Sequence, residues 1–231
     1  GTVMIDAVGQ HARFLRIAAT SGSTAALQLA SGWLDVRETL SVGLTGTGSV
    51  LQSGGLVRAG TSVVIGNSTT PGTYALSGGT LATPLLTKGN AGSSFNFTGG
   101  VLHADRVAFS LTNNGGTIAP GSDDQLRKIA AASMPDINRN VELVQPLVGN
   151  TRINGDLTLQ AGTLQIDLES LTSFDSITVD GALSLGGELA VVLGGGYVPA
   201  PGSQWLIGSA AAITGNFSSV TSGFFTYTVG G

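Results

Sequence analysis

The chain has 231 residues, of which 42% are hydrophobic and only 10% are charged, so it can bury a core and is not disordered by composition. Its formal net charge is −4 and it contains no cysteine, which excludes disulfides and thiolate metal sites and argues against nucleic acid as a partner. Glycine supplies 36 residues, about twice the usual share, and such a composition is typical of short strands joined by tight turns.

Short apolar or alternating segments follow one another along the chain, separated by Gly, Asn, Ser or Thr, and this pattern predicts an all-β fold. A β-sandwich has a similar spacing of strands, so the strands alone do not choose the architecture. In chain order, the predicted strands are Phe14–Ala18, Ala25–Leu29, Leu34–Val36, Ser62–Ile65, Tyr74–Leu76, Ser94–Phe97, Val107–Leu111, Asp156–Leu159, Thr163–Leu168, Ser176–Val179, Ala182–Leu185 and Glu188–Leu193.

A glycine phrase that recurs with a period near 20–25 residues favours a β-solenoid, because that period is about one coil. A glycine can adopt the positive φ of a coil corner, and the residue after it starts the next strand. The phrase ends at Gly32, Gly55, Gly79, Gly100, Gly116, Gly162 and Gly187. We therefore predict a parallel β-helix of about seven coils. One aliphatic residue from each coil should join an internal ladder made of Leu34, Leu56, Leu81, Leu102, Ile118, Leu164 and Leu189.

Residues 122–150 break this pattern, because they are richer in charge and poorer in glycine. Ser122 and Gln125 form a capping-box pattern and Pro135 ends the run, which predicts a short helix at 123–133. We interpret the chain as one continuous domain, with β-helix coils at 1–121, a helical insertion at 122–150, and final coils with a β cap at 151–231. The charged residues of the insertion are the predicted interaction site, namely Asp123, Asp124, Arg127, Lys128, Arg139 and Glu142.

The C-terminal part of the chain is expected to close the solenoid, because an open end would expose unpaired strand edges and core. Aromatic residues concentrate there and should seal the core, although they could also stack on sugars. These residues are Trp205, Phe217, Phe224, Phe225 and Tyr227.

The sequence gives little support for a catalytic or ligand-binding site. Asp123 and Asp124 could serve as a glycosidase pair, but helix capping explains them better. A cation or sugar site formed by Asp167, Asp175 and Asp180 is disfavoured because the last two lie five residues apart.

Basic residues offer no stronger pattern. Arg58 or Arg106, near Asp105, could imitate the base of a lyase, and the two histidines, His11 and His103, have no metal-ligand spacing. We predict no catalytic residue, no cofactor and no metal.

Several phrases resemble the autotransporter-associated β-strand repeat, which occurs in autotransporter passengers and in exported proteins with a PEP-CTERM tail. They include residues 72–81, residues 95–104 and Gly115–Gly121, while residues 174–187 and 213–220 resemble the segment that closes such passengers. The resemblance covers the chain except roughly 122–148. It implies a right-handed parallel β-helix, export, and an extracellular or bacterial cell-surface location. It supplies no catalytic residues.

These features together predict an extracellular structural or adhesive scaffold that is not an enzyme and that self-assembles as a homo-oligomer or filament. A cell-surface or matrix polysaccharide is the expected non-protein partner, and no transmembrane helix is predicted, because no stretch approaches 18 apolar residues. The alternatives are a β-helix polysaccharide lyase or glycoside hydrolase, and a phage or secreted appendage fibre. Both ends read as cut, so we expect a mature product or a fragment.

Overall fold

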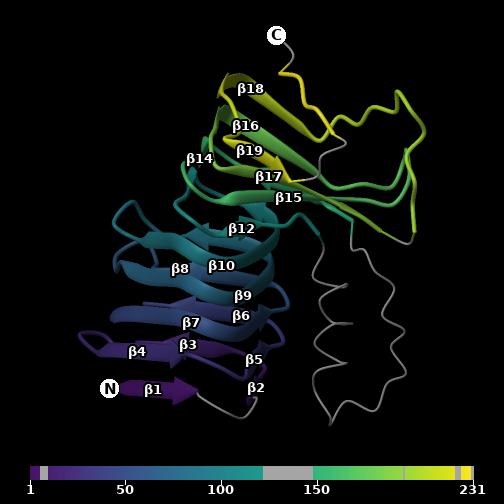
Figure 1. Cartoon of the computed structure of the whole chain (residues 1–231). Coiled ribbons are helices and arrows are strands. Elements are labelled where there is room, and N and C mark those ends of the chain that lie inside the picture. Colours follow the sequence, from purple (N-terminus) through teal and green to yellow (C-terminus); the bar gives the residue numbers. More distant parts are fainter. Residues whose placement is uncertain (6–9, 122–147, 195, 222–224, 230–231) are drawn as a thin grey trace.

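A computed structural model describes residues 1–5, 10–121, 148–194, 196–221 and 225–229, and these form a β-solenoid of about seven turns (Figure 1). All named strands pair in parallel with the strand one coil away, which confirms the predicted parallel β-helix. The strands are β1 (Thr2–Ile5), β2 (Gln10–Ala12), β3 (Leu15–Ile17), β4 (Thr24–Leu29), β5 (Trp33–Val36), β6 (Thr39–Val42), β7 (Thr47–Ala59), β8 (Ser62–Ile65), β9 (Gly72–Lys88), β10 (Ser94–Val107), β11 (Leu111–Asn113), β12 (Thr117–Ile118), β13 (Asn150–Ile153), β14 (Leu157–Leu159), β15 (Thr163–Leu168), β16 (Ser176–Leu185), β17 (Glu188–Leu193), β18 (Gly208–Gly215) and β19 (Ser219–Thr221).

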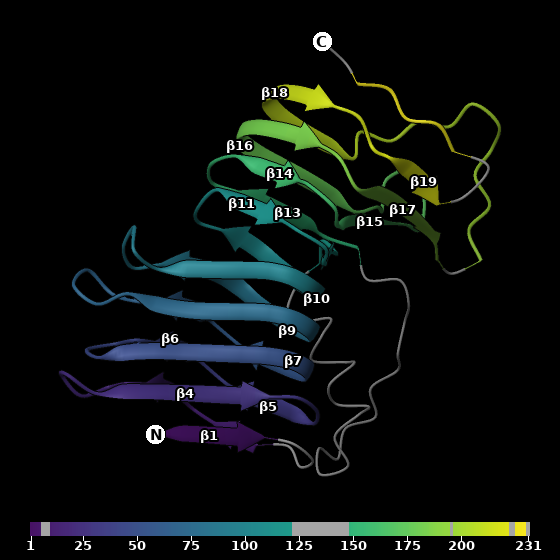
Figure 2. The ribbon, with the colours of Figure 1, turned by 60° about the vertical axis from the view of Figure 1, so that its left-hand side comes forward.

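Each coil contributes a segment to three stacked faces, which the register defines. The first face contains β1, β4, β11, β14 and the starts of β7, β9 and β10 (Figure 2). The second face contains β2, β5, the later parts of β7, β9 and β10, and then β12, β15, β17 and β19. The third face contains β3, β6, β8, the ends of β9 and β10, β13 and the start of β16.

The predicted glycine column forms the corner between the first and second faces. Gly32, Gly55, Gly79 and Gly100 all have φ between 67° and 76°, and Gly187 has φ of 58°, a backbone conformation that other residues adopt at a cost. Gly116 and Gly162 do not have the positive φ predicted for this corner. The column is also tightly packed, because a Cβ atom on Gly79 would lie 2.3 Å from the carbonyl oxygen of Gly55. Strands β7, β9 and β10 continue through this corner, so β9 and β10 are longer than the predicted strands Tyr74–Leu76 and Ser94–Phe97.

The internal ladder is confirmed at six of its seven predicted positions, and Leu56 is the exception. The register joins Leu34 to Val57 and Val57 to Leu81, so Val57 occupies the inward position. Every other ladder residue lies two positions after the corner glycine, whereas Leu56 lies one position after Gly55. Because strand residues alternate between faces, that difference of one residue turns Leu56 outward.

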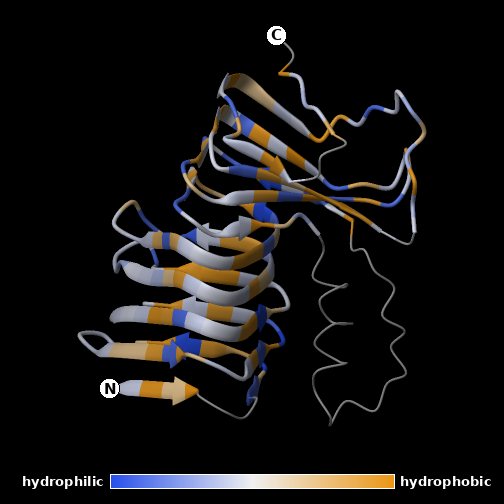
Figure 3. Cartoon of the chain, in the orientation of Figure 1, coloured by the Kyte–Doolittle hydropathy of each residue, from blue (hydrophilic) through white to orange (hydrophobic). Residues whose placement is uncertain are grey.

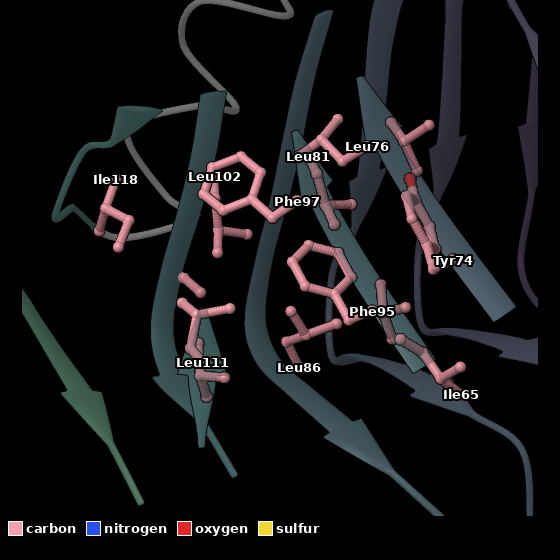
Figure 4. Packing of buried hydrophobic residues seen from close by; sticks show 14 of the residues in the cluster. Ile65, Tyr74, Leu76, Leu81, Leu86, Phe95, Phe97, Leu102, Leu111 and Ile118 are labelled. Atoms are coloured by element: carbon pink, nitrogen blue, oxygen red, sulfur yellow. The ribbon is translucent and has the colours of Figure 1, made fainter. Parts of the chain in front are cut away.

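The core is a continuous stack of aliphatic and aromatic side chains (Figure 4). It includes a buried polar contact, in which the Tyr74 hydroxyl donates to Gln52 Oε1 at 2.6 Å while Gln52 Nε2 donates to the Thr80 carbonyl at 2.8 Å. Burial raises the pKa of Tyr74 well above its usual range, so the phenol remains a donor.

We expect the Tyr74→Phe variant to unfold with a free energy lower by about 1–3 kcal/mol, because Gln52 Oε1 would lose this donor inside the core. Urea unfolding followed by circular dichroism measures the change. Tyr227→Phe is the matched control, since its hydroxyl makes only an exposed contact of 3.4 Å with Asn216. Equal midpoints for the two variants would contradict the expectation.

The structure contradicts one predicted strand and does not describe the predicted helix. The strand predicted at Val107–Leu111 is wrong, because β10 ends at Val107 and β11 begins at Leu111 with a turn between them. The predicted helix at 123–133 lies outside the described residues. After residues 122–147, the chain is described again from Val148, and β13 begins at Asn150, so that residue belongs to a coil and not to the insertion.

The C-terminal segment forms the predicted cap. Trp205 contacts Tyr197 and Phe225 edge to face at centroid distances of 6.3 and 6.0 Å, and Phe217 contacts Tyr227 at 5.3 Å. All five rings are half-buried against the core. The Trp205 indole N–H donates to the Ser170 carbonyl at 3.0 Å, which ties this layer to the penultimate coils. Phe224 lies outside the described residues.

Candidate interaction surface

The six charged residues predicted to form the interaction site, Asp123, Asp124, Arg127, Lys128, Arg139 and Glu142, all lie outside the described residues. Only 10% of the residues of the chain are charged, and the hydrophilic residues of the described part, in blue, are scattered over the coils (Figure 3). A candidate surface must therefore be built from the outward side chains of the coils themselves.

Several of the described charges form ion pairs that link neighbouring coils. Arg13 Nε donates to Glu38 Oε1 at 2.5 Å, and Arg58 Nη1 donates to Asp35 Oδ1. Arg152 Nε donates to Asp180 Oδ1 at 2.9 Å. These pairs lie 23 to 28 residues apart in sequence, about one coil. The charges therefore reinforce the stacking of coils.

One outward column on the second face is unusually buried, and we call it the outer column: Asp35, Arg58, Ala82, His103 and Ala119. The register joins Asp35 to Arg58, Arg58 to Ala82, and Ala82 to His103. Asp35 is 8% exposed and Arg58 is 5% exposed, while Ala82 and Ala119 are fully or almost fully buried.

Acid–base chemistry on the outer column is limited by this burial. His103 points outward, as predicted, and burial lowers its pKa to about 4. His11 lies at the start of the column, where its Nδ1 is 3.2 Å from Asp35 Oδ2 and its ring meets Trp33 edge to face at 4.5 Å. The histidines are thus held in separate surroundings, and only His11 is paired with a carboxylate.

A second outward row lies beside the outer column and is unusually apolar at three positions. Trp33, Leu56 and Val101 each directly follow a corner glycine and are half-buried. The register joins Trp33 to Leu56, and Val101 follows two coils later. The second face therefore presents apolar side chains to its outside as well as to the core.

The three aspartates considered for a cation or sugar site do not act together. Asp175 is buried, and its carboxylate accepts hydrogen bonds from the backbone N–H groups of Gly149 at 2.7 Å and Asp167 at 3.0 Å. Asp180 lies at the surface, where hydrogen bonds from Asn154 and Arg152 lower its pKa. Burial raises the pKa of Asp175 to about 8, partly offset by the two N–H donors.

This burial predicts that the protein loses stability as the pH rises from about 4 to 8. In that window Asp175 is neutral in the folded protein but ionised in the unfolded chain, so the unfolded chain binds fewer protons and the free energy of unfolding falls. The expected fall is on the order of a few kcal/mol. Urea unfolding of the Asp175→Asn variant should show a flatter pH dependence, whereas Asp180→Asn should keep the wild-type slope. If the free energy of unfolding depended on pH in the same way for the wild type and Asp175→Asn, burial of Asp175 would not be the cause of the loss of stability.

The suggested lyase arrangement is replaced by structural contacts. Arg58 binds Asp35, and Arg106 Nε donates to the Asn154 side chain. Sequence reasoning missed the Asp35–Arg58 pair. Its spacing of 23 residues, one glycine period, was the signal that could have found it.

Within the described part of the chain, no group of three or more His, Asp or Glu residues could hold a metal ion. The same residues include no helix with the length and hydropathy needed to cross a membrane. No protein-family model matches the chain, and no match was found among curated proteins or solved structures.

Proposed function

We propose that this protein is an extracellular or cell-surface β-helix that acts as a structural scaffold or adhesive rod. The observation that carries this proposal is that its ion pairs join neighbouring coils, as in Arg58–Asp35 and Arg152–Asp180. Charges used in this way stabilise a long stack. In a β-helix glycosidase, by contrast, carboxylates from several strands must converge on one sugar ring.

The resemblance to the autotransporter-associated repeat supports export and a surface location. The repeat phrases at residues 72–81 and 95–104 lie in β9 and β10, where they form the corner and the adjoining strand segments. A regular stack of this kind presents extended faces, which suit repeated weak contacts with a polysaccharide or with further copies.

A direct test combines imaging with a search for turnover. The purified chain is examined by electron microscopy and mass photometry, and separately incubated with acidic and neutral polysaccharides while released sugars are measured. We expect rods or filaments and no release of sugar. Release by the wild type that is lost in Asp123→Ala and Asp124→Ala would replace the scaffold with a lyase or hydrolase. A stable trimer would instead favour an appendage fibre.

A further inference from the structure

The outward side of the third face becomes charged partway along the stack. The register joins one outward column from coil to coil, and it consists of Thr39, Ser62, Leu85, Arg106, Arg152, Thr178 and Ser209. The two arginines are exposed, whereas Thr39 and Leu85 are half-buried and Ser62 is buried. The charge of this column is therefore concentrated where β10 pairs with β13.

Arg106 and Arg152 form a pair of like charges on neighbouring strands. They lie directly opposite each other in the register of β10 and β13, and like charges in such positions destabilise a sheet. Neighbouring strands are about 4.8 Å apart, so one small anionic group can reach both guanidinium groups. An anion bound between the two arginines would offset their repulsion.

Neighbouring polar side chains hold both guanidinium groups in place. Arg152 Nε and Nη2 each lie 2.9 Å from Asp180 Oδ1, and Arg106 Nε donates to Asn154 Oδ1. Asn154 Nδ2 in turn donates to Asp180 Oδ2. Among the described residues, the terminal nitrogens of Arg106 and Nη1 of Arg152 have no hydrogen-bond partner. The donors that remain are thus oriented in advance for a ligand.

Uncharged hydrogen-bonding side chains surround the two arginines on the same face. Asn150 and Asn154 lie two residues before and two residues after Arg152. Asn150 Nδ2 donates to Ser176 Oγ at 2.9 Å, and Thr178 lies opposite Arg152 in β16. Amide and hydroxyl groups both donate and accept hydrogen bonds, as the hydroxyl groups of a sugar do.

We propose that Arg106 and Arg152 form a binding site for the anionic groups of a polysaccharide, which are the carboxylates of uronic acids or sulfate esters. A guanidinium group binds such planar or branched oxyanions through two parallel hydrogen bonds. The amide and hydroxyl groups beside the arginines suit the neighbouring sugar hydroxyls. This inference rests on the polysaccharide partner of the proposed function and adds that the polysaccharide is acidic.

Binding to immobilised polymers tests the site in the full chain. The polymers are polygalacturonate, dextran sulfate, neutral dextran and polyglutamate. We expect binding to polygalacturonate or dextran sulfate, weakened by added salt, and the polymer that binds identifies carboxylate or sulfate as the anion. Binding to neither of these, or equal binding to neutral dextran, would overturn the proposal. Polyglutamate supplies carboxylates without sugar hydroxyls, so equal or tighter binding to it would also overturn the proposal.

Substitutions at the two arginines locate the site. We expect Arg106→Gln and Arg152→Gln each to weaken binding about tenfold, the usual effect of removing hydrogen bonds to a charged group. Arg16→Gln is the matched control, because Arg16 is an exposed outward arginine of the third face on β3. It should bind within about twofold of the wild type, and an equal loss in all three variants would show attraction by overall charge only.

The sign of the ligand's charge is tested by Asp105→Asn, which removes the carboxylate next to Arg106 in the sequence. This variant should bind the acidic polymer at least as tightly as the wild type, because one source of repulsion is lost. Weaker binding by Asp105→Asn, with an unchanged circular dichroism spectrum, would contradict an anion site.

A measurement of stability covers the case in which a variant folds poorly. The acidic polymer that binds should raise the urea midpoint of the wild type, because it binds only the folded chain. An unchanged midpoint would count against the site. Rods in electron microscopy without polymer binding would overturn this inference and leave the scaffold. Release of sugar, with binding lost in Arg106→Gln, would overturn the scaffold and leave the site.

Discussion

Replacing Phe97 by alanine is expected to lower the free energy of unfolding by about 3–5 kcal/mol, the usual cost of removing a fully buried aromatic ring. Phe97 is fully buried, and its ring centroid lies 5.8 Å from that of Phe95. The next coil is shaped to receive it, because a Cβ atom on Gly116 would be 2.0 Å from Phe97 Cε2. A rigid stack cannot close around the resulting cavity, so the cost should lie in the upper part of the range for core truncations.

Urea unfolding followed by circular dichroism gives this free energy, and the slope of the transition shows whether the coils still unfold together. Leu51→Ala is the matched control, since Leu51 lies on the same first face but points outward and is 46% exposed. We expect the control to remain within about 0.5–1 kcal/mol of the wild type. A cost below 1 kcal/mol for Phe97→Ala would mean that the internal stack is not the main source of stability.

Replacing Gly79 by alanine is expected to cost about 3 kcal/mol or more, and to prevent the coils from stacking normally at that corner. Two effects add. Gly79 has φ of 74°, where a non-glycine residue is strained, and a Cβ atom would lie 2.3 Å from the Gly55 carbonyl oxygen. The obstructing atoms belong to the backbone of the neighbouring coil, so they cannot rotate away as a flexible side chain could.

Gly22→Ala separates the two effects. Gly22 has a similar φ of 71°, but a Cβ atom added there would meet no other atom within 4 Å, so its substitution should cost only the backbone strain, about 1–2 kcal/mol. The difference between the variants in urea unfolding therefore measures the close approach of coils at the glycine column. If both substitutions lower the free energy of unfolding equally, the close packing at the glycine column contributes nothing measurable to stability.

Both substitutions bear on the proposed scaffold. In a solenoid each coil contacts only its neighbours, so stability is approximately the sum of coil and interface contributions. A defect at Gly79 should weaken the interface with the Gly55 coil first, and any rods that the wild type forms in electron microscopy should then be shorter or absent. Gly22→Ala, in a loop away from this corner, should leave them unchanged.

The prediction that the C-terminal aromatic residues cap the solenoid is confirmed. Their concentration in the last part of the chain indicated a cap, because the terminal coil needs apolar cover. The partners of Trp205 could not be assigned in advance, since Tyr197 and Phe225 lie on different segments that only the final coils bring together. The ring contacts therefore depend on the path of the chain after β17.

The sequence by itself determined the parallel β-helix and the glycine column. Both repeat with a period of about one coil, and each coil contacts mainly the equivalent residues of the coils above and below it. Only the tertiary structure decided that Val57 and not Leu56 points inward, because a shift of one residue reverses the face of a strand. It also decided that Asp35 pairs with Arg58 and that Asp175 is buried. Those features depend on contacts between residues far apart in the chain, which no local pattern of residues records.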